Sequence, residues 1–441
     1  MTHPPPPAAT ETVAEAVAAP TPGVYQVGTI TYDRPRLAKL FFWLLLGDFC
    51  WNVMETALPK LLPLQMDSQG VKASGIAWMM STGSLAALIF SPFIGVWSDR
   101  LRTRWGRRRP FLFISTPIMA AGLLIIPHVH NFWVLNLVVM VIQVMNVLQT
   151  VMLYLYADIM PASLMGRFMA AFRLVGFSGG LAFQYFLFPH FGTSPVMVWT
   201  VCAVVYLVVF QLSLHMIKEG EYPAPEPVDL RKMIVGYVKE GLTGRYMWML
   251  WLTMGMSAIA APGGYFTDLF GKNQLHMTIP EIARMNTWAM IPTILLTMPC
   301  GWLIDKYGPR LIWASSLFIN GAVGVFAYFA IETKVGLQWL YMVNSCTGTL
   351  AAVALMPMLY AHLPRDKFGQ FTSTQSLVVH SIIFSSANLL GQLISAQGDN
   401  YRFAILYGSS FLLLTPIFAL LLKRTPCPFG KHEMAMTHKQ G

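Results

Sequence analysis

Charged residues are scarce in this 441-residue chain: Asp, Glu, Lys and Arg together make up 11% of it. An average soluble domain contains roughly 25%. Hydrophobic residues account for 55%, which is more apolar surface than a water-soluble protein of this length can bury. Runs of about 20 apolar residues recur from Leu37 to Leu422, and each is long enough to cross a bilayer as a helix. The composition therefore predicts an all-α polytopic membrane protein, and the alternating segments of a membrane β-barrel are absent.

Motifs for metal, disulfide and nucleotide chemistry are also missing. The five cysteines have neither CxxC nor metal-ligand spacing, so we interpret them as packing thiols. No G-x-x-x-x-G-K-[ST] motif occurs, which excludes ATP hydrolysis by the P-loop route. Near the C-terminus, His432, Glu433 and His438 stand in HEMAMTH, which is not the H-E-x-x-H of zinc proteases. We therefore expect no enzyme activity, no metal and no cofactor.

The basic residues are placed as topology signals. The formal net charge is +10, but Lys and Arg lie in short loops between apolar runs, so we expect no nucleic-acid partner. With the N-terminus in the cytoplasm, 23 of the 30 basic residues fall on the cytoplasmic side and 6 on the other. The first 30 residues lack the pattern of a cleavable signal peptide. We expect a multi-pass protein of the cell (inner) membrane with both termini in the cytoplasm.

Twelve membrane-length spans are expected, six on each side of a polar interval: 38–61, 74–97, 111–129, 133–158, 166–188, 195–217, 246–268, 280–304, 310–331, 337–361, 367–395 and 400–422. The predicted organisation is a disordered cytoplasmic N-terminal tail (1–36), a first six-helix bundle (37–217), a cytoplasmic linker (218–245), a second six-helix bundle (246–424) and a cytoplasmic tail (425–441).

Two short motifs recur in the two halves. Gly95–Pro110 reads GVWSDRLRTRWGRRRP, and a weaker copy, GWLIDKYGPR, occurs at Gly301–Arg310. The link YADIMPASLMGRF (Tyr156–Phe168) matches YAHLPRDKFGQF (Tyr360–Phe371). The two matches stand at corresponding places, so they indicate a parallel duplication of a six-helix unit, which is typical of transporters.

The spacing of the first motif resembles the conserved loop of the major facilitator superfamily. Its extended form, SDRLRTRWGRRRPF, is similar to that of sucrose transporters and of the glycoside–pentoside–hexuronide:cation symporters. The resemblance covers residues 37–424. It implies two pseudo-symmetric six-helix bundles around a central cavity, a small-molecule substrate, here a sugar, and a coupling cation, here H⁺. We expect the protein to act as a monomer in the lipid bilayer.

Polar residues in the first expected span are the main candidates for the cavity. Asp48, Asn52 and Glu55 are offset by 4 and 7 positions, which places them within about 40° on one helix face. A bare charge at membrane depth costs about 2.5–3.5 kcal/mol or more, so it should face a cavity or a partner. Either Asp48 or Glu55 would bind the coupling proton. The alternative is an ion pair with Arg173 within the membrane.

Sucrose transporters, which this chain resembles, use a carboxylate of the fourth helix and an arginine of the fifth for proton coupling and sugar contact. Asp158 and Arg173 occupy similar segments here. Asp158 lies so near the cytoplasm that it could instead belong to an inner gate with Arg167. Gln184 follows Arg173 by eleven residues, which places it on nearly the same helix face, where it could share the cavity.

Neutral polar stripes mark two further helices. The expected span 133–158 carries Gln143, Asn146 and Thr150, and the span 367–395 carries Ser381, Ser385, Asn388 and Gln392 beside His380. Such side chains among aromatic rings suit a hydroxyl-rich ligand. Hydrogen bonding between helices explains them as well. For His380, a proton carrier and a satisfied core histidine both remain open.

Charges at the inner helix ends suggest a gate. Asp99 should meet the free N–H groups at the start of the span near Lys367, and Asp305 should meet the start of the span at 166–168. The alternative is that these charges only set topology. The motif APGGYF (Ala261–Phe266) is expected to be an outer hinge. The predicted cytoplasmic gate consists of Asp99, Arg100, Arg107, Arg108, Asp158, Arg167, Asp305 and Arg310.

These features predict a secondary active transporter that works by alternating access, as a proton-coupled symporter of a sugar or glycoside. The alternatives are an exporter of drugs or other metabolites with the same fold, and a non-transporting membrane sensor or assembly factor. Charges inside the spans argue against the last, because an inert scaffold has little reason to keep them.

Overall fold

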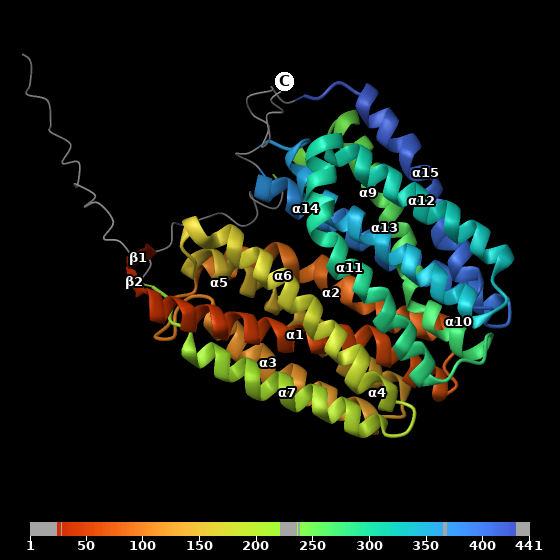
Figure 1. Ribbon diagram of the computed structural model, residues 1–441, viewed down its shortest axis with the longest axis horizontal. Helices are drawn as coiled ribbons and strands as arrows, with labels where there is room; N and C mark the ends of the chain where they lie inside the picture. Colours follow the sequence, from red (N-terminus) through yellow and green to blue (C-terminus); the bar gives the residue numbers. More distant parts are fainter. Residues whose placement is uncertain (1–23, 28, 221–235, 237–238, 365–367, 429–441) are drawn as a thin grey trace, which may run out of the picture.

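Figure 1 shows the computed structural model, which describes residues 24–27, 29–220, 236, 239–364 and 368–428. The first half of the chain forms a bundle of helices: α1 (Arg34–Ser68), α2 (Ala73–Arg100), α3 (Arg109–Ile125), α4 (Phe132–Gln149), α5 (Val151–Ile159), α6 (Met165–Ala182) and α7 (Pro195–Met216). The second half forms another: α9 (Arg245–Ala260), α10 (Thr267–Asn273), α11 (Ile279–Tyr307), α12 (Pro309–Ala330), α13 (Lys334–Tyr360), α14 (Phe368–Ala396) and α15 (Phe403–Arg424).

The all-α membrane fold expected from the sequence is confirmed. Eleven helical segments of the described residues are long and apolar enough to cross a membrane. The remaining expected span, 246–268, is divided into α9, a 3₁₀ turn at Ala261–Tyr265 and α10. Pro262 lacks the N–H that an α-helix would use at this place, which explains why the helix is broken in the APGGYF motif.

Three local features were not expected. Span four is divided into α4 and α5 at Thr150. Helix α6 continues as a π-helical turn at Phe183–Leu187 and a 3₁₀ turn at Phe188–His190. Part of the N-terminal tail that we expected to be disordered is a hairpin of β1 (Val24–Val27) and β2 (Ile30–Asp33), and α1 already begins at Arg34. Alternating Val, Tyr, Ile and Thr side chains favour such strands, and Asp33 caps α1 through the backbone N–H of Arg36.

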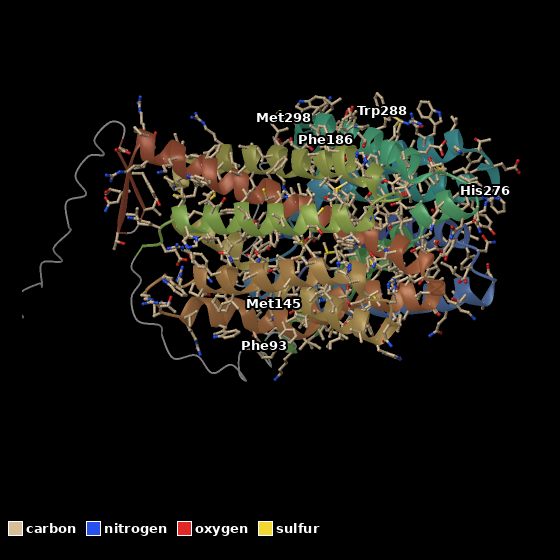
Figure 2. The ribbon with its side chains drawn as sticks, turned by 90° about the horizontal axis from the view of Figure 1, so that it is seen from below. Phe93, Met145, Phe186, His276, Trp288 and Met298 are labelled. Carbon is tan, nitrogen blue, oxygen red and sulfur yellow. The ribbon has the colours of Figure 1, made fainter. Side chains whose placement is uncertain are left out.

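Large apolar side chains cover the outer surface of both bundles. Figure 2 labels Phe93, Phe186, Trp288 and Met298 among them, and their exposed fractions lie between 44% and 78%. In a soluble protein such a surface would aggregate, whereas in a bilayer these side chains contact lipid. The apolar surface is therefore the surface of a protein embedded in membrane.

The two bundles share a core at one end only. We call the end that carries the Arg100–Arg109 loop the hinge side, and the opposite end the far side. One cluster of buried apolar residues runs through the first bundle and continues into far-side residues of the second, including Phe266, Ile282 and Ile394. The hinge-side part of the second bundle has a separate cluster. Figure 1 shows α6 and α11 close together on the far side and diverging toward the hinge side.

Candidate functional site

An ion pair with a buried carboxylate joins the two bundles on the far side. Lys60 of α1 donates to Asp268 of α10 and to Asn286 of α11, each at 2.8 Å. The Asp268 carboxylate also accepts from the Tyr341 hydroxyl at 2.6 Å and from the Asn286 amide at 3.1 Å. Its side chain is only 7% exposed. One basic residue of the first bundle is thereby held by three helices of the second.

A second set of polar contacts lies closer to the far-side surface. Asp67, at the end of α1, accepts from Lys272 and Asn273 at 2.8 Å and from the Tyr401 hydroxyl at 3.1 Å. At the start of α2, the backbone N–H of Ala73 donates to the Asp399 carboxylate at 3.0 Å. Together with Lys60 and Asp268, these contacts close the far side. In the sequence, Lys60 and Lys272 are two of the six basic residues outside the cytoplasmic set, and nothing beside them indicates a partner some 200 residues away.

On the hinge side, the described charges of the first bundle pair with one another. Asp158 accepts from Arg107 at 2.6 Å and from Arg108 at 3.0 Å. Arg108 also contacts Asp99. The Glu219 carboxylate accepts from the backbone N–H groups at the start of α3, at distances between 2.7 and 3.2 Å. An acidic side chain at this position satisfies free N–H groups and complements the positive end of the helix.

The predicted gate residues on the hinge side differ in their partners and in their exposure. Asp158 pairs with Arg107 and Arg108 rather than with Arg167, which is exposed. Asp305 is also exposed. The partner expected for Asp99, near Lys367, lies outside the described residues. The latch stays a prediction.

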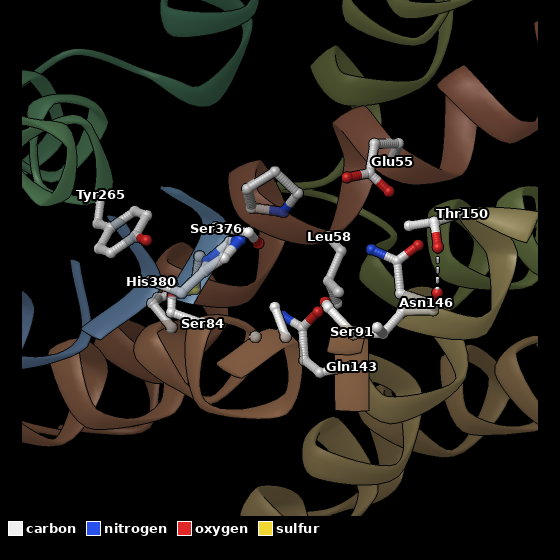
Figure 3. A pocket seen from close by; sticks show the side chains of 15 residues that line it. Glu55, Leu58, Ser84, Ser91, Gln143, Asn146, Thr150, Tyr265, Ser376 and His380 are labelled. Atoms are coloured by element: carbon white, nitrogen blue, oxygen red, sulfur yellow. Dashed lines mark hydrogen bonds between the residues drawn. The ribbon is translucent and has the colours of Figure 1, made fainter. Parts of the chain in front are cut away.

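A cavity of about 400 Å³, with polar side chains in a partly apolar wall, lies between the two bundles. In Figure 3, Glu55 of α1 and Asn146 and Thr150 of span four stand at one end, and His380 and Ser376 of α14 stand at the other, next to Ser84 of α2. Gln143 lies between them, and Tyr265 of the helix break closes the second-bundle side. The size falls within the range of small-molecule sites. The cavity offers donors, acceptors and one carboxylate to a polar ligand.

Two of the sequence-predicted stripes meet in this cavity. Gln143, Asn146 and Thr150 all line it, as do Glu55 and His380. The Oδ1 of Asn146 and the Nδ1 of His380 are buried and have no hydrogen-bond partner among the described residues. Buried polar atoms without partners are costly unless water or a ligand satisfies them. Ser84, Ser91, Tyr265 and Ser376 were missed, because isolated serines in apolar helices give no distinct sequence signal.

Asp48 and Asn52 lie outside the cavity, although they share a helix face with Glu55. Asp48 is fully buried and accepts from the Asn52 amide at 3.0 Å, and its Oδ2 has no partner. A Cβ added to Gly176 of α6 would lie 3.0 Å from that oxygen. The glycine thus allows α6 to approach the polar face of α1 closely. Arg173 is exposed and acts on Asp48 electrostatically, but the described residues contain no ion pair between them.

The other cavity candidates have different surroundings. Asn388 donates to Ser81 of α2 at 3.1 Å, so this part of the α14 stripe bonds between helices. Ser385 is exposed. Gln184 is 2% exposed and lines a separate cavity between α6 and α11.

Comparisons with known proteins agree with this architecture. The model of the Major Facilitator Superfamily matches residues 40–286, which is more than half of the chain. The sucrose transport protein SUC3 of Arabidopsis thaliana is 29% identical over 67 residues, covering 15% of this chain and 11% of that protein. Solute carrier family 45 member 4 of Homo sapiens is 43% identical over 67 residues, covering 15% of this chain and 8% of that protein. The chain thus aligns with only a small part of the length of these relatives.

Solved structures share the fold over almost the whole chain. A bacterial homolog of the human lysosomal transporter Spinster, in an inward-facing and occupied conformation, has a TM-score of 0.72 and 13% identity. The alignment covers 90% of this chain and 98% of that one. An identity of 13% to this structure shows only that the fold is shared. The family assignment comes from the match between the sequence and the family model. The chain belongs to the Major Facilitator Superfamily, a family of membrane transport proteins.

Proposed function

We propose that this protein is a secondary active transporter that carries a sugar or glycoside together with a proton. The observation that carries the proposal is the cavity of Glu55, Gln143, Asn146 and His380 between the two bundles. Sugars need many hydrogen-bond partners, and this cavity supplies amides, hydroxyls, an imidazole and a carboxylate beside the Tyr265 ring. The short matches to sucrose transport proteins support the same substrate class.

The conformation supports alternating access. The far side is held by contacts between the bundles, and α6 and α11 diverge toward the hinge side (Figure 1). With the hinge side in the cytoplasm, as the distribution of basic residues predicts, this is an inward-facing arrangement. The substrate would leave toward the cytoplasm after the far side has closed behind it.

Glu55 and Asp48 would have different roles in coupling. Glu55 is the carboxylate that a ligand in the cavity can reach. Asp48 is buried beneath α6, where a charge without a partner is costly. The proton would then be carried at Asp48 or Glu55, and Arg173 would act on Asp48 through its field.

Uptake by purified protein in proteoliposomes tests the proposal. Radiolabelled mono- and disaccharides are offered with and without an inward proton gradient, and with a sodium gradient as the alternative. We expect one of these sugars to accumulate only with the proton gradient. Uptake that ignores the gradient would exclude proton symport, and failure of every sugar to bind would exclude the substrate class.

Two matched variants connect the result to the cavity. Glu55→Gln should reduce sugar binding and uptake at least tenfold, because it removes the only carboxylate among the residues that line the cavity. Glu332→Gln makes the same chemical change at an exposed position, and uptake should stay at the wild-type level. Equal uptake by both variants would remove Glu55 from the binding site.

A further inference from the structure

A second cavity opens toward the lipid between the two bundles. It lies between α6 with its π-helical extension and the first turns of α11, and its volume is about 640 Å³. We call it the lateral groove and define it by Gln184, Tyr185, Phe186, Arg284 and Trp288. None of these residues lines the central cavity.

The groove has closed ends and an open flank. At its far-side end, a Cβ on Gly192 would lie 3.2 Å from Ile279, and at the other end a Cβ on Gly180 would lie 3.0 Å from Met290. The span from Ile279 to Met290 corresponds to about 16 Å of helix. Figure 2 shows Phe186 and Trp288 together at the edge of the molecule, where they are 64% and 50% exposed. An occupant therefore enters from the membrane.

Two polar groups in the groove have no partner among the residues that the structure describes. The Oε1 of Gln184 is buried and accepts no hydrogen bond, although the side chain is only 2% exposed. Arg284 is exposed and forms no hydrogen bond or ion pair with any residue that the structure describes. The nearby Lys334, by contrast, is paired: its ammonium lies 2.9 Å from the Glu281 carboxylate. The groove thus presents a free cation at its surface and an unsatisfied acceptor deeper inside.

A membrane phospholipid satisfies both groups and the apolar walls. A phosphate complements the guanidinium of Arg284. A headgroup hydroxyl or ammonium can donate to Gln184, and an acyl chain can lie along Phe186 and Trp288. The π-helical turn at Phe183–Leu187 is what turns Gln184 and the two aromatic residues after it, Tyr185 and Phe186, toward one groove, and such turns often mark functional sites.

We propose that the lateral groove is a binding site for a phospholipid whose headgroup carries a hydrogen-bond donor, with its phosphate at Arg284 and the donor at Gln184. This site does not depend on the transported substrate. Because its walls belong to different bundles and meet only while the far side is closed, a bound lipid also stabilises that closed state.

Native mass spectrometry of the protein released from nanodiscs tests the site. The nanodiscs contain equal parts of phosphatidylglycerol, which has headgroup hydroxyls, and phosphatidylcholine, which has none. Wild-type protein should retain phosphatidylglycerol in preference. Arg284→Gln should lower retention of both lipids at least fivefold, and Gln184→Met, of similar length, should abolish the preference between them. Lys334→Gln removes a positive charge at the same end of the molecule and should retain the wild-type pattern.

A second measurement locates the lipid even if a variant retains lipid elsewhere. Phosphatidylglycerol with brominated acyl chains should quench part of the tryptophan fluorescence, and Trp288→Phe should remove more of this quenching than Trp339→Phe, another exposed tryptophan. Equal lipid retention by wild type and Arg284→Gln, or equal quenching losses in the two tryptophan variants, would overturn the proposal. Sugar uptake tests the proposed transport separately, so the two can fail independently.

Discussion

The far side and the hinge side of this protein use charge in opposite ways. On the far side, Lys60 and Asp268 come from different bundles and meet in a buried network. On the hinge side, Arg107, Arg108 and Asp158 all belong to the first bundle. Charge on the far side therefore holds the two bundles together, whereas the charge we can assign on the hinge side holds one bundle together.

The acidic side chains on the two sides also differ in their exposure to solvent. The side chain of Asp268 is 7% exposed, while that of Asp99, in the last turn of α2 on the hinge side, is 57% exposed. A buried pair is little screened by salt and is costly to break one partner at a time, whereas an exposed pair contributes little. The far side thus behaves as a lock between bundles. Asp99 remains accessible to a partner in another state, as the latch hypothesis requires.

The largest expected effect comes from removing Lys60. Lys60→Met leaves the buried Asp268 without its counter-charge, which typically costs about 3–5 kcal/mol. The cost applies to the far-side-closed state, so we expect the protein to shift toward a state that is open on the far side. The measurement is labelling by a membrane-impermeant maleimide of a cysteine placed at Ser74, after replacement of the five native cysteines. Unchanged labelling would show that the ion pair does not hold the bundles together.

Removing Asp158 should have a different kind of effect. Asp158→Asn removes one of the two carboxylates that Arg107 and Arg108 contact, while Asp99 remains, and the arginine side chains are only 16% and 6% exposed. Because charged hydrogen bonds are lost, we expect a loss of about 2 kcal/mol in the stability of the first bundle, seen as a lower thermal unfolding temperature in detergent. Labelling at the Ser74 position should remain at the wild-type level. If that labelling rose as we expect for Lys60→Met, the hinge-side charges would also control closure of the far side, contrary to the prediction.

Close packing on the far side can be tested without charge. A Cβ on Gly391 of α14 would lie 2.3 Å from the Cβ of Ala77 in α2, so Gly391→Ala must push the two helices apart. Overpacking of this kind costs about 1–3 kcal/mol, and we expect far-side labelling to rise. Gly348→Ala is the control, because no atom lies within 4 Å of the added carbon. Equal behaviour of both variants would contradict the prediction.

The smallest effect is expected at Asp67, which lies nearer the surface. Its side chain is 13% exposed and that of its partner Lys272 is 28% exposed. For a partly solvated pair, Asp67→Asn should cost about 1 kcal/mol, and Asn273 and Tyr401 can still donate to the new amide oxygen. Far-side labelling should rise less than in Lys60→Met, and high salt should reduce the difference from wild type. An effect as large as that of Lys60→Met would place the main lock at Asp67.

Much of the cavity was predictable, because polar residues in apolar helices are rare and their spacing defines a face. Gln143, Asn146 and Thr150 were expected to lie together, and all three line the cavity with Glu55. The same reasoning failed to separate Asp48 from Glu55. Helical spacing shows that the two carboxylates share one face of α1. It does not show which part of that face packs against α6 and which part lines the cavity. That boundary is set by Gly176, which faces Asp48 across the helix contact.

The far-side lock was not predictable. Lys60 and Asp268 are 208 positions apart, and each is a single charge at the edge of a long apolar run in the sequence, where such charges are ordinary. The lateral groove was missed for a similar reason. Gln184 was expected in the central cavity from its offset to Arg173, but the π-helical turn at Phe183–Leu187 interrupts the α-helical spacing on which that expectation depended.

The sequence by itself determined that the chain crosses a membrane many times, that its two halves share two motifs and that its family is that of the major facilitators. These properties follow from hydrophobic run length and from repeated local motifs, which need no knowledge of contacts. The tertiary structure decided which charges meet, which carboxylate faces the cavity and where the bundles close. Those outcomes depend on distances between residues far apart in the chain, and such distances are set by how whole helices pack.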